Sequence, residues 1–176
     1  MSLESSTNRT AREQPTMPTP DQHAQFMQQA IELATENVTS GCGGPFGAVI
    51  VRDGEIVATG VNCVTANNDP TAHAEVTAIR AACNALGSFL LTGCTIYTSC
   101  EPCPMCLAAI YWSRCEAIFF GNTAADAAHA GFDDSFLYTE VQRPHAARTI
   151  PTQQLLPDQA IASFNAWRER TDRIDY

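Results

Sequence analysis

Four residues of this chain have the types and spacings that build a catalytic zinc site. His73 and Glu75 lie two positions apart, and Cys103 and Cys106 lie three apart within a Pro-Cys-Pro-Met-Cys stretch. Catalytic zinc is usually held by three protein ligands, with a fourth position left for water or substrate. Two thiolates and one imidazole suit zinc better than magnesium or calcium, which prefer oxygen ligands. The sequence therefore predicts one zinc ion per chain, held by His73, Cys103 and Cys106.

Glu75 has no ligand role in this site and is suited to proton transfer. Zinc lowers the pKa of a bound water to about 7, which provides a hydroxide nucleophile at neutral pH. A nearby carboxylate can take a proton from that water and hand it to a leaving group. The order His-x-Glu and then Pro-Cys-x-x-Cys resembles the signature of the zinc-dependent base deaminases. This resemblance implies that the leaving group is an amine and that Glu75 is the catalytic proton carrier.

Two other interpretations of the cysteine pair remain open from the residues alone. A structural zinc site would need a fourth protein ligand, and Cys42, Cys63 or Cys100 could supply it. A redox pair is the other alternative. Glu75, together with the proline before Cys103, favours the catalytic site over both.

Composition and charge limit the compartment and the partners. The 176 residues suffice for one well-cored domain, and no apolar run approaches the roughly 18 residues of a membrane span. We therefore expect a soluble, cytoplasmic protein without membrane contact. The net charge of −9 argues against a nucleic-acid partner, which needs a basic surface, and favours a small molecule. The six remaining cysteines are expected to be buried thiols in a reducing compartment.

The elements that must position the site follow from periodicity and turn residues. Residues 1–20 are expected to be a disordered extension, and residues 21–176 to form the catalytic domain. Thr19-Pro20-Asp21-Gln22 predicts a capping box at the start of a helix that ends near Thr39. Strands are predicted over residues 46–51, 55–61, 95–99, 116–120 and 148–156. Helices are predicted over residues 72–86, 104–113, 123–130 and 157–170, the last burying Ile161, Phe164 and Trp167.

The spacing of His73 and Glu75 places a condition on the helix that carries them. Residues two apart in an ideal helix point about 200° away from each other. The two side chains can therefore face one metal only if the helix start is distorted or the ion lies above the helix end, and we favour the second arrangement. Two strands that each lead into a metal-binding helix form a βαβ arrangement, which predicts a site at the carboxyl ends of the strands.

Longer stretches around these motifs resemble the bacterial guanine deaminases of the cytidine deaminase fold. The similarity runs from about Gln25 to Tyr176 and is carried by residues 43–51, 67–80, 97–106, 109–112 and 130–136. The zinc motif is shared by the whole superfamily, whereas the Phe-Asp-Asp of the last stretch and the terminal Asp-Tyr are more specific. The resemblance implies a three-layer α/β/α sandwich around a five-stranded mixed sheet. It also implies a homodimer in which the C-terminal segment of each chain covers the active site of the other.

The resemblance further implies zinc-dependent hydrolysis of guanine to xanthine and ammonia, in purine catabolism or salvage. Without the resemblance, the residues that it places at the substrate have ordinary explanations. Asn62 would be a loop residue, Phe46 a core aromatic, Asp133 and Asp134 a shared helix cap, and Tyr176 a frayed terminus. The implied substrate contacts are Asn62 on the purine edge, Phe46 stacked on the base, Asp134 on the guanine N–H groups and in proton transfer, the N–H groups of Ala74 and Cys103, Trp112 as a wall and Tyr176 as a lid.

Two alternative functions remain at this point. One is a related deaminase that acts on cytosine, on a triazine such as ammeline, or on a tRNA adenosine. The acidic charge disfavours tRNA, and the Phe-Asp-Asp segment disfavours the small bases. The other alternative is a zinc-stabilised binding module without activity, which would bind zinc, turn over no base and unfold on chelation.

Overall fold

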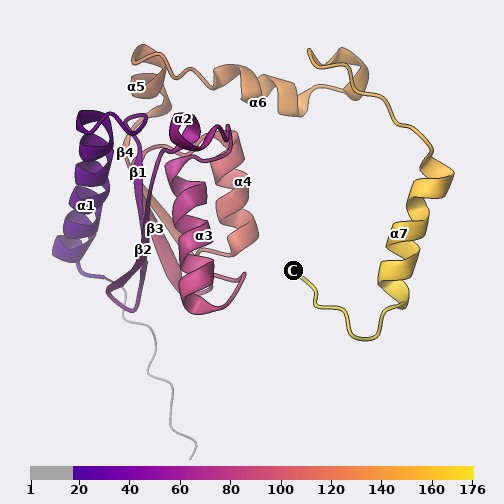
Figure 1. Ribbon diagram of the computed structural model, residues 1–176, viewed down its shortest axis with the longest axis horizontal. Helices are drawn as coiled ribbons and strands as arrows, with labels where there is room; N and C mark the ends of the chain where they lie inside the picture. Colours follow the sequence, from indigo (N-terminus) through magenta and orange to yellow (C-terminus); the bar gives the residue numbers. More distant parts are fainter. Residues whose placement is uncertain (1–17) are drawn as a thin grey trace, which may run out of the picture.

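The computed structural model describes residues 18–176, so the predicted N-terminal extension lies outside the described residues except for its last three positions. Thr19 caps the first helix with the predicted capping box, in which its side chain and that of Gln22 bond reciprocally to backbone N–H groups. The elements, shown in Figure 1, are α1 (Pro20–Thr39), β1 (Gly47–Arg52), β2 (Glu55–Val61), α2 (Val64–Asn67), α3 (Ala74–Leu86), β3 (Cys94–Cys100), α4 (Pro104–Ser113), β4 (Ala117–Asn122), α5 (Ala124–His129), α6 (Ser135–Gln142), the 3-10 helix η1 (His145–Ala147) and α7 (Pro157–Glu169).

The sheet has the strand order β2-β1-β3-β4. Strand β1 runs antiparallel to both β2 and β3, and β3 runs parallel to β4. Strands β2 and β3 therefore point the same way, and each is followed at its carboxyl end by a helix of the predicted site, α3 after β2 and α4 after β3. This confirms the predicted βαβ arrangement, which brings the two helix starts to one edge of the sheet.

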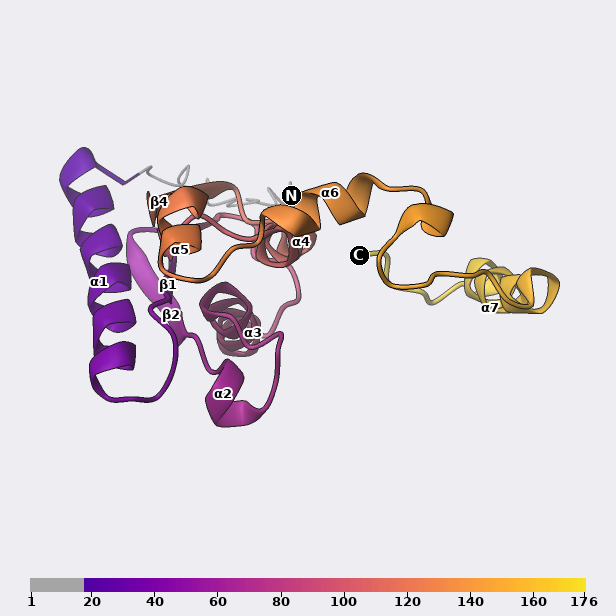
Figure 2. The ribbon, with the colours of Figure 1, turned by 90° about the horizontal axis from the view of Figure 1, so that it is seen from above.

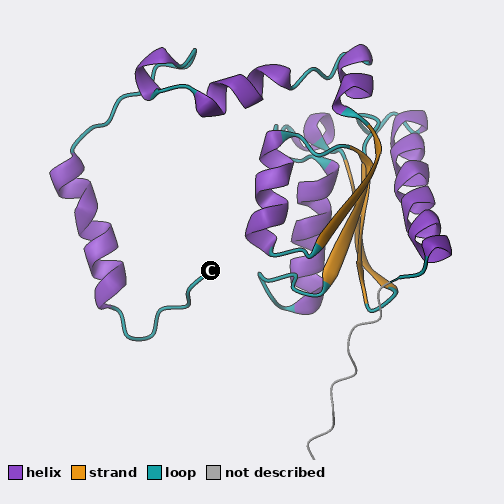
Figure 3. Ribbon diagram, turned by 180° about the vertical axis from the view of Figure 1, so that it is seen from behind, coloured by secondary structure: helices purple, strands orange, loops and turns teal. Residues whose placement is uncertain are grey.

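Helices cover both faces of this sheet and create two core layers (Figure 3). On one face α1 packs over Val49, Val51 and Tyr97, and on the other α3 and α4 pack over Ile50 and Ile96. The alternation follows from the two-residue period of a strand, which sends successive side chains to opposite faces. Because both faces are covered, β3 is buried along its whole length. The structure is thus an α/β sandwich of three layers.

Gly60 lets α3 lie directly on strand β2. A Cβ atom at this position would be 2.3 Å from the carbonyl oxygen of Ala74 and 2.4 Å from the backbone nitrogen of Ala78. Both alanines are completely buried against the sheet. The first turn of α3 is therefore fixed to the strand by backbone contact, which in turn fixes the residue that precedes it, His73.

After α5 the chain leaves the core. Residues 130–176, which we call the C-terminal arm, contain α6, η1 and α7 and extend away from the sheet before the C-terminus turns back (Figure 2). The apolar residues of α7 that were predicted to be buried are exposed, by 48% for Ile161, 67% for Phe164 and 37% for Trp167. That prediction is wrong for the single chain, because α7 lies apart from the sheet that its apolar face was expected to cover.

The predicted fifth strand over residues 148–156 is also wrong, because within the described residues the sheet has four strands. The segment belongs to the arm and lies away from both edges of the sheet, so its β-branched residues have no strand to pair with. Helix α6 was not predicted, and it begins inside the stretch of residues 130–136 that contains the Phe-Asp-Asp segment. The short helices α2 and η1 were not predicted either, and the remaining helices and strands agree with the predicted ranges within two residues at each end.

Two further expectations concern cysteines and membranes. Of the six cysteines outside the metal motif, only Cys94 and Cys100 are fully buried, and burial raises the pKa of each thiol to about 11. Cys42 is exposed, and Cys63, Cys83 and Cys115 are half-buried, so the prediction of buried thiols holds only in part.

From residue 18 onward, the chain contains no helix with the length and apolarity that a bilayer crossing requires.

Candidate active site

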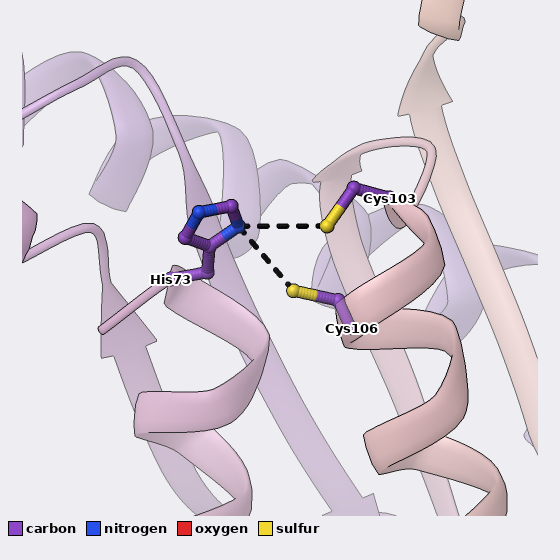
Figure 4. A group of neighbouring side chains, drawn as sticks. All are labelled: His73, Cys103 and Cys106. Carbon is purple, nitrogen blue, oxygen red and sulfur yellow. Dashed lines mark hydrogen bonds between the residues drawn. The ribbon is translucent and has the colours of Figure 1, made fainter. Parts of the chain in front are cut away.

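The three predicted metal ligands meet where α3 and α4 begin (Figure 4). His73 is the N-cap of α3 and Cys103 the N-cap of α4, and both have extended backbones, with φ and ψ of −68° and 158° and of −62° and 166°. Cys106 lies in the first turn of α4. Because His73 precedes its helix while Glu75 lies within it, the 200° separation of an ideal helix does not apply to the pair. The positions of His73 and Cys103 before their helices are compatible with the predicted metal above the helix ends.

The distances between the ligand atoms fit a tetrahedral zinc ion. Nδ1 of His73 lies 3.6 Å from Sγ of Cys103 and 3.5 Å from Sγ of Cys106. A tetrahedral ion with Zn–N of about 2.0 Å and Zn–S of about 2.3 Å would separate N from S by about 3.5 Å. Among the described residues the cluster contains only these three ligands. Cys42, Cys63 and Cys100 do not join it, so the fourth position of the tetrahedron is open to a water or a substrate.

The electrostatics of the cluster favour a thiolate at Cys103. Hydrogen bonding with Cys106, and then with His73, lowers the pKa of the Cys103 thiol to about 4. The same hydrogen bond, together with burial, raises the pKa of Cys106. The hydrogen bond to Cys103 is also the main cause of a raised pKa at His73. Thiolates are the form in which cysteine binds metal, so Cys103 is prepared as a ligand.

Glu75 is buried beside this cluster without being one of its ligands. Its side chain is 6% exposed, and burial is the main cause that raises the pKa of its carboxyl group. The negative charge of Cys103 adds to this effect, and hydrogen bonding with Cys106 opposes it. A carboxyl group whose pKa is raised toward neutrality can both accept and return a proton. Glu75 therefore has the position and the electrostatics of a general acid–base group.

A cavity of about 640 Å³ opens in front of the ligands, within the size range of small-molecule sites. His73, Cys103 and Glu75 form one side of it. The cavity also contains three of the predicted contact residues, Phe46, Asn62 and Asp134, so the structure brings these together with the metal ligands. Segments from three parts of the chain build its walls, namely residues 41–46 after α1, residues 62–65 after β2 and residues 124–137 of α5 and the arm.

Asn62 and Phe46 are fixed to each other by the backbone. The N–H of Asn62 donates to the carbonyl oxygen of Phe46 at 3.1 Å. The side chain of Asn62 is 8% exposed, and its Oδ1 accepts a hydrogen bond of 3.3 Å from the N–H of Val64. The ring of Phe132 packs edge-on against that of Phe46, with 5.0 Å between centroids. Phe132 is a cavity residue that the sequence reasoning missed, although it stands inside the Phe-Asp-Asp segment that was singled out.

The structure separates the two adjacent acids of that segment. Oδ1 of Asp133 accepts a hydrogen bond of 2.9 Å from the N–H of Ser135, and this interaction lowers the pKa of Asp133. Asp134 makes no such capping bond, and partial burial near Cys103 raises the pKa of its carboxyl group. Asp134 is thus the N-cap residue of α6 by position but makes no side-chain capping bond, whereas Asp133 accepts the first N–H of the helix, which leaves the carboxylate of Asp134 available to the cavity.

Three predicted contact residues lie outside the lining of this cavity. Ala74 is completely buried in the core, so only its backbone is at the helix end. Trp112 is 61% exposed and lies near the other end of α4, roughly 13 Å along the helix axis from Cys103. Tyr176 lies beside Trp112 and Phe89, with ring centroids 6.2 and 6.5 Å away. Within one chain, neither Trp112 nor Tyr176 reaches the site, and their roles stay predictions.

Comparison with known proteins agrees with this chemistry. Residues 20–122 match the family described as the cytidine and deoxycytidylate deaminase zinc-binding region. The chain belongs to this family. As in other zinc-binding deaminases of the family, the metal that fits the ligand set is zinc, and the cluster of His73, Cys103 and Cys106 is the part of this chain that can hold it.

Individual relatives within the family differ in how much of the chain they match. The guanine deaminase of Bacillus subtilis (strain 168) is 55% identical over 88% of this chain and 99% of its own length. A crystal structure of guanine deaminase from Bacillus subtilis superposes with a TM-score of 0.86, covering 88% of this chain and 98% of that one. A tRNA-specific adenosine deaminase from Aquifex aeolicus is 46% identical, over 49% of this chain and 56% of its own length. The match to the guanine deaminase thus extends into the C-terminal region.

A metal site with only three protein ligands should lose its zinc when one of these ligands is removed. Cys106→Ala should lower bound zinc from about one ion per chain to below about a tenth, because only two ligands would remain. Cys100→Ala removes a neighbouring thiol that lies outside the cluster, so it should retain the parental zinc content. Elemental analysis of the purified proteins measures both. Loss of zinc from Cys100→Ala to the same extent as from Cys106→Ala would show a closed, four-ligand site instead.

Proposed function

We propose that this protein is a zinc-dependent guanine deaminase, which hydrolyses guanine to xanthine and ammonia in purine catabolism or salvage. One observation carries the proposal: a three-ligand metal cluster with a buried, non-ligand Glu75 faces a cavity large enough for a purine. The 55% identity to the Bacillus subtilis guanine deaminase, over 88% of this chain, supports guanine as the substrate.

The residues of the cluster and Glu75 divide the reaction between them. His73, Cys103 and Cys106 would hold the zinc ion, which would supply Lewis-acid activation of a water molecule. Glu75 accepts a proton from that water as the water oxygen bonds to C2 of guanine. It delivers that proton to the ring nitrogen, then takes the remaining proton from the hydroxyl group now on C2 and gives it to the exocyclic amine as the C–N bond breaks and ammonia leaves. The raised pKa of Glu75 suits this role, because the same group must bind and release protons in one cycle.

The other cavity residues orient the base. Asn62 binds the purine edge, and Phe46 stacks on the ring. Asp134 accepts hydrogen bonds from the N–H groups of guanine and assists proton movement, whereas Asp133 remains bonded to the N–H of Ser135 at the start of α6. The N–H groups of Ala74 and Cys103, at the starts of two helices, point to polar groups of the substrate. The proximity of Asn62, Phe46 and Asp134 to the metal ligands supports these assignments.

The C-terminal arm completes the site of a second copy. In one chain Tyr176 lies near the C-terminal ends of α3 and α4, whereas the metal ligands lie at the N-terminal ends of the same helices. The arm also exposes large apolar side chains, among them Phe164, by 67%. These features support a homodimer in which each arm covers the partner's cavity, with Tyr176 as a lid and Trp112 as a wall of the pocket.

The free thiols support a cytoplasmic location, where cysteines are kept reduced.

Ammonia release in the presence of guanine, cytosine, adenine and a triazine tests the proposed activity. We expect guanine to be turned over well above the other bases, with zinc present in the same sample. Glu75→Gln should retain zinc and lower kcat by about 10²- to 10⁴-fold, because it removes the proton carrier and not a ligand. Zinc without turnover of any base would favour a binding module, and preferred turnover of another base would favour a related deaminase.

The two adjacent acids provide a matched pair of variants. Asp134→Asn should lower kcat/KM for guanine by about 10²-fold, because it removes a charge that faces the substrate. Asp133→Asn should stay within about threefold of the parent, because asparagine also accepts the hydrogen bond from the N–H of Ser135. Steady-state kinetics on both proteins measures the difference. Equal losses in the two variants would contradict the assignment of Asp134 to the substrate.

Mixed dimers test whether the arm crosses between chains. One chain carries Glu75→Gln with an intact tail, and the other has an intact Glu75 but lacks residues 173–176. Each homodimer should be inactive. If the arm crosses, the mixed dimer has one complete site and should recover about half of the parental activity, because the first chain's tail covers the second chain's site. Co-expression with two affinity tags allows the mixed species to be isolated.

The mixed dimer also distinguishes the opposite arrangement. If each tail covered the site of its own chain, neither chain of the mixed dimer would have a complete site. Activity no higher than that of the two homodimers would therefore contradict the exchange. Zinc analysis of the shortened chain provides the control, since the deletion lies outside the metal cluster and should leave its zinc content unchanged.

A further inference from the structure

Asn37, near the end of α1, is a buried polar residue that contacts two walls of the active-site cavity. It is 5% exposed. Its side-chain Nδ2 donates two hydrogen bonds, each of 2.9 Å, to the carbonyl oxygens of Gly44 and Asn62. Gly44 and Asn62 both line the cavity. One amide group thus connects the segment after α1 with the end of β2.

The backbone of Asn37 holds the same segment from the other side. Its carbonyl oxygen accepts hydrogen bonds from the N–H groups of Cys42 and Gly43, at 3.1 and 3.3 Å. The hydroxyl group of Ser40 donates a hydrogen bond of 3.2 Å to the same carbonyl oxygen. The loop therefore wraps around Asn37, which is its main attachment to α1.

The loop after α1 packs closely against Asn62 and Asn37 at Gly43. A Cβ atom on Gly43 would lie 2.1 Å from the carbonyl oxygen of Asn62 and 2.8 Å from Nδ2 of Asn37. Asn62 is in turn bonded through its N–H to the carbonyl oxygen of Phe46. A displacement of the Asn37 amide would therefore move Asn62 and Phe46 together.

We propose that Asn37 is a positioning residue that sets Asn62 and Phe46 for purine binding while contacting neither the metal ligands nor the substrate. This inference rests on the proposed function, in which Asn62 and Phe46 bind guanine. Asparagine suits the position because its amide offers two N–H donors to two buried carbonyl oxygens. Alanine would leave both carbonyls without their partner, and aspartate would place an oxygen against them.

Enzyme kinetics with guanine tests the inference on the full-length protein. Asn37→Ala should raise KM for guanine about tenfold, the effect of one buried hydrogen bond, with kcat within about threefold of the parent. Zinc content should be unchanged, since Asn37 is not part of the metal cluster. Asn37→Asp, which keeps the shape but not the donors, should raise KM at least as much. Thr35→Ala, which removes another side-chain hydrogen bond from the exposed face of the same helix, should behave as the parent.

A double-mutant cycle separates positioning from general destabilisation. If Asn37 acts through Asn62, Asn37→Ala should add little to the KM of Asn62→Ala, within about threefold. Unchanged KM in both Asn37 variants, full additivity with Asn62→Ala, or a loss of zinc and of thermal stability that accounts for the lost activity would each overturn the inference. A parent without guanine turnover would overturn the proposed function itself. A parental KM in Asn62→Ala would refute the role of Asn62, and the positioning role with it.

Discussion

The meeting of two helix starts at one edge of the sheet is the constraint on which the rest of the structure depends. Strands β2 and β3 run in the same direction, with β1 between them, so the helices that follow both begin at the same edge. The residue before each helix, His73 or Cys103, has an extended backbone and turns its side chain toward the gap. The positive ends of both helix dipoles face this gap, where they favour thiolates and other anionic groups.

Segments that are far apart in the sequence hold the two helix starts and the walls of the cavity in position. Gly60 allows α3 to lie on β2 at backbone distance, and small alanines continue this contact along the helix. On the opposite face, α1 anchors the loop that forms one wall of the cavity. The arm adds the other wall with Phe132 and Asp134. The rigid core therefore holds the metal ligands, while two more peripheral segments shape the space for the substrate.

The core elements were predictable because their signals are local. The capping box at Thr19, the tight turn between β1 and β2, and the proline at the start of α4 mark boundaries that depend on a few neighbouring residues. The metal ligands were predictable because their chemistry restricts the residue types. The arm was not, since residues 148–156 and α7 have the composition of buried elements but no surface of their own chain to cover. Asp133 and Asp134 could be distinguished only by the hydrogen bond that Asp133 accepts from the N–H of Ser135, which sequence spacing does not reveal.

The positions of the aromatic residues determine which parts of this protein its intrinsic fluorescence reports on. The chain contains two tryptophans, and both lie outside the core, Trp112 near the far end of α4 and Trp167 in α7. The aromatic residue at the centre of the sheet is a tyrosine, Tyr97, which is fully buried and stacked on Phe119. Tryptophan emission would therefore follow the docking of the arm and the surroundings of α4, and not the packing around Tyr97 in the sheet. A change in tryptophan emission on dilution would thus report on assembly even while the sheet stays folded.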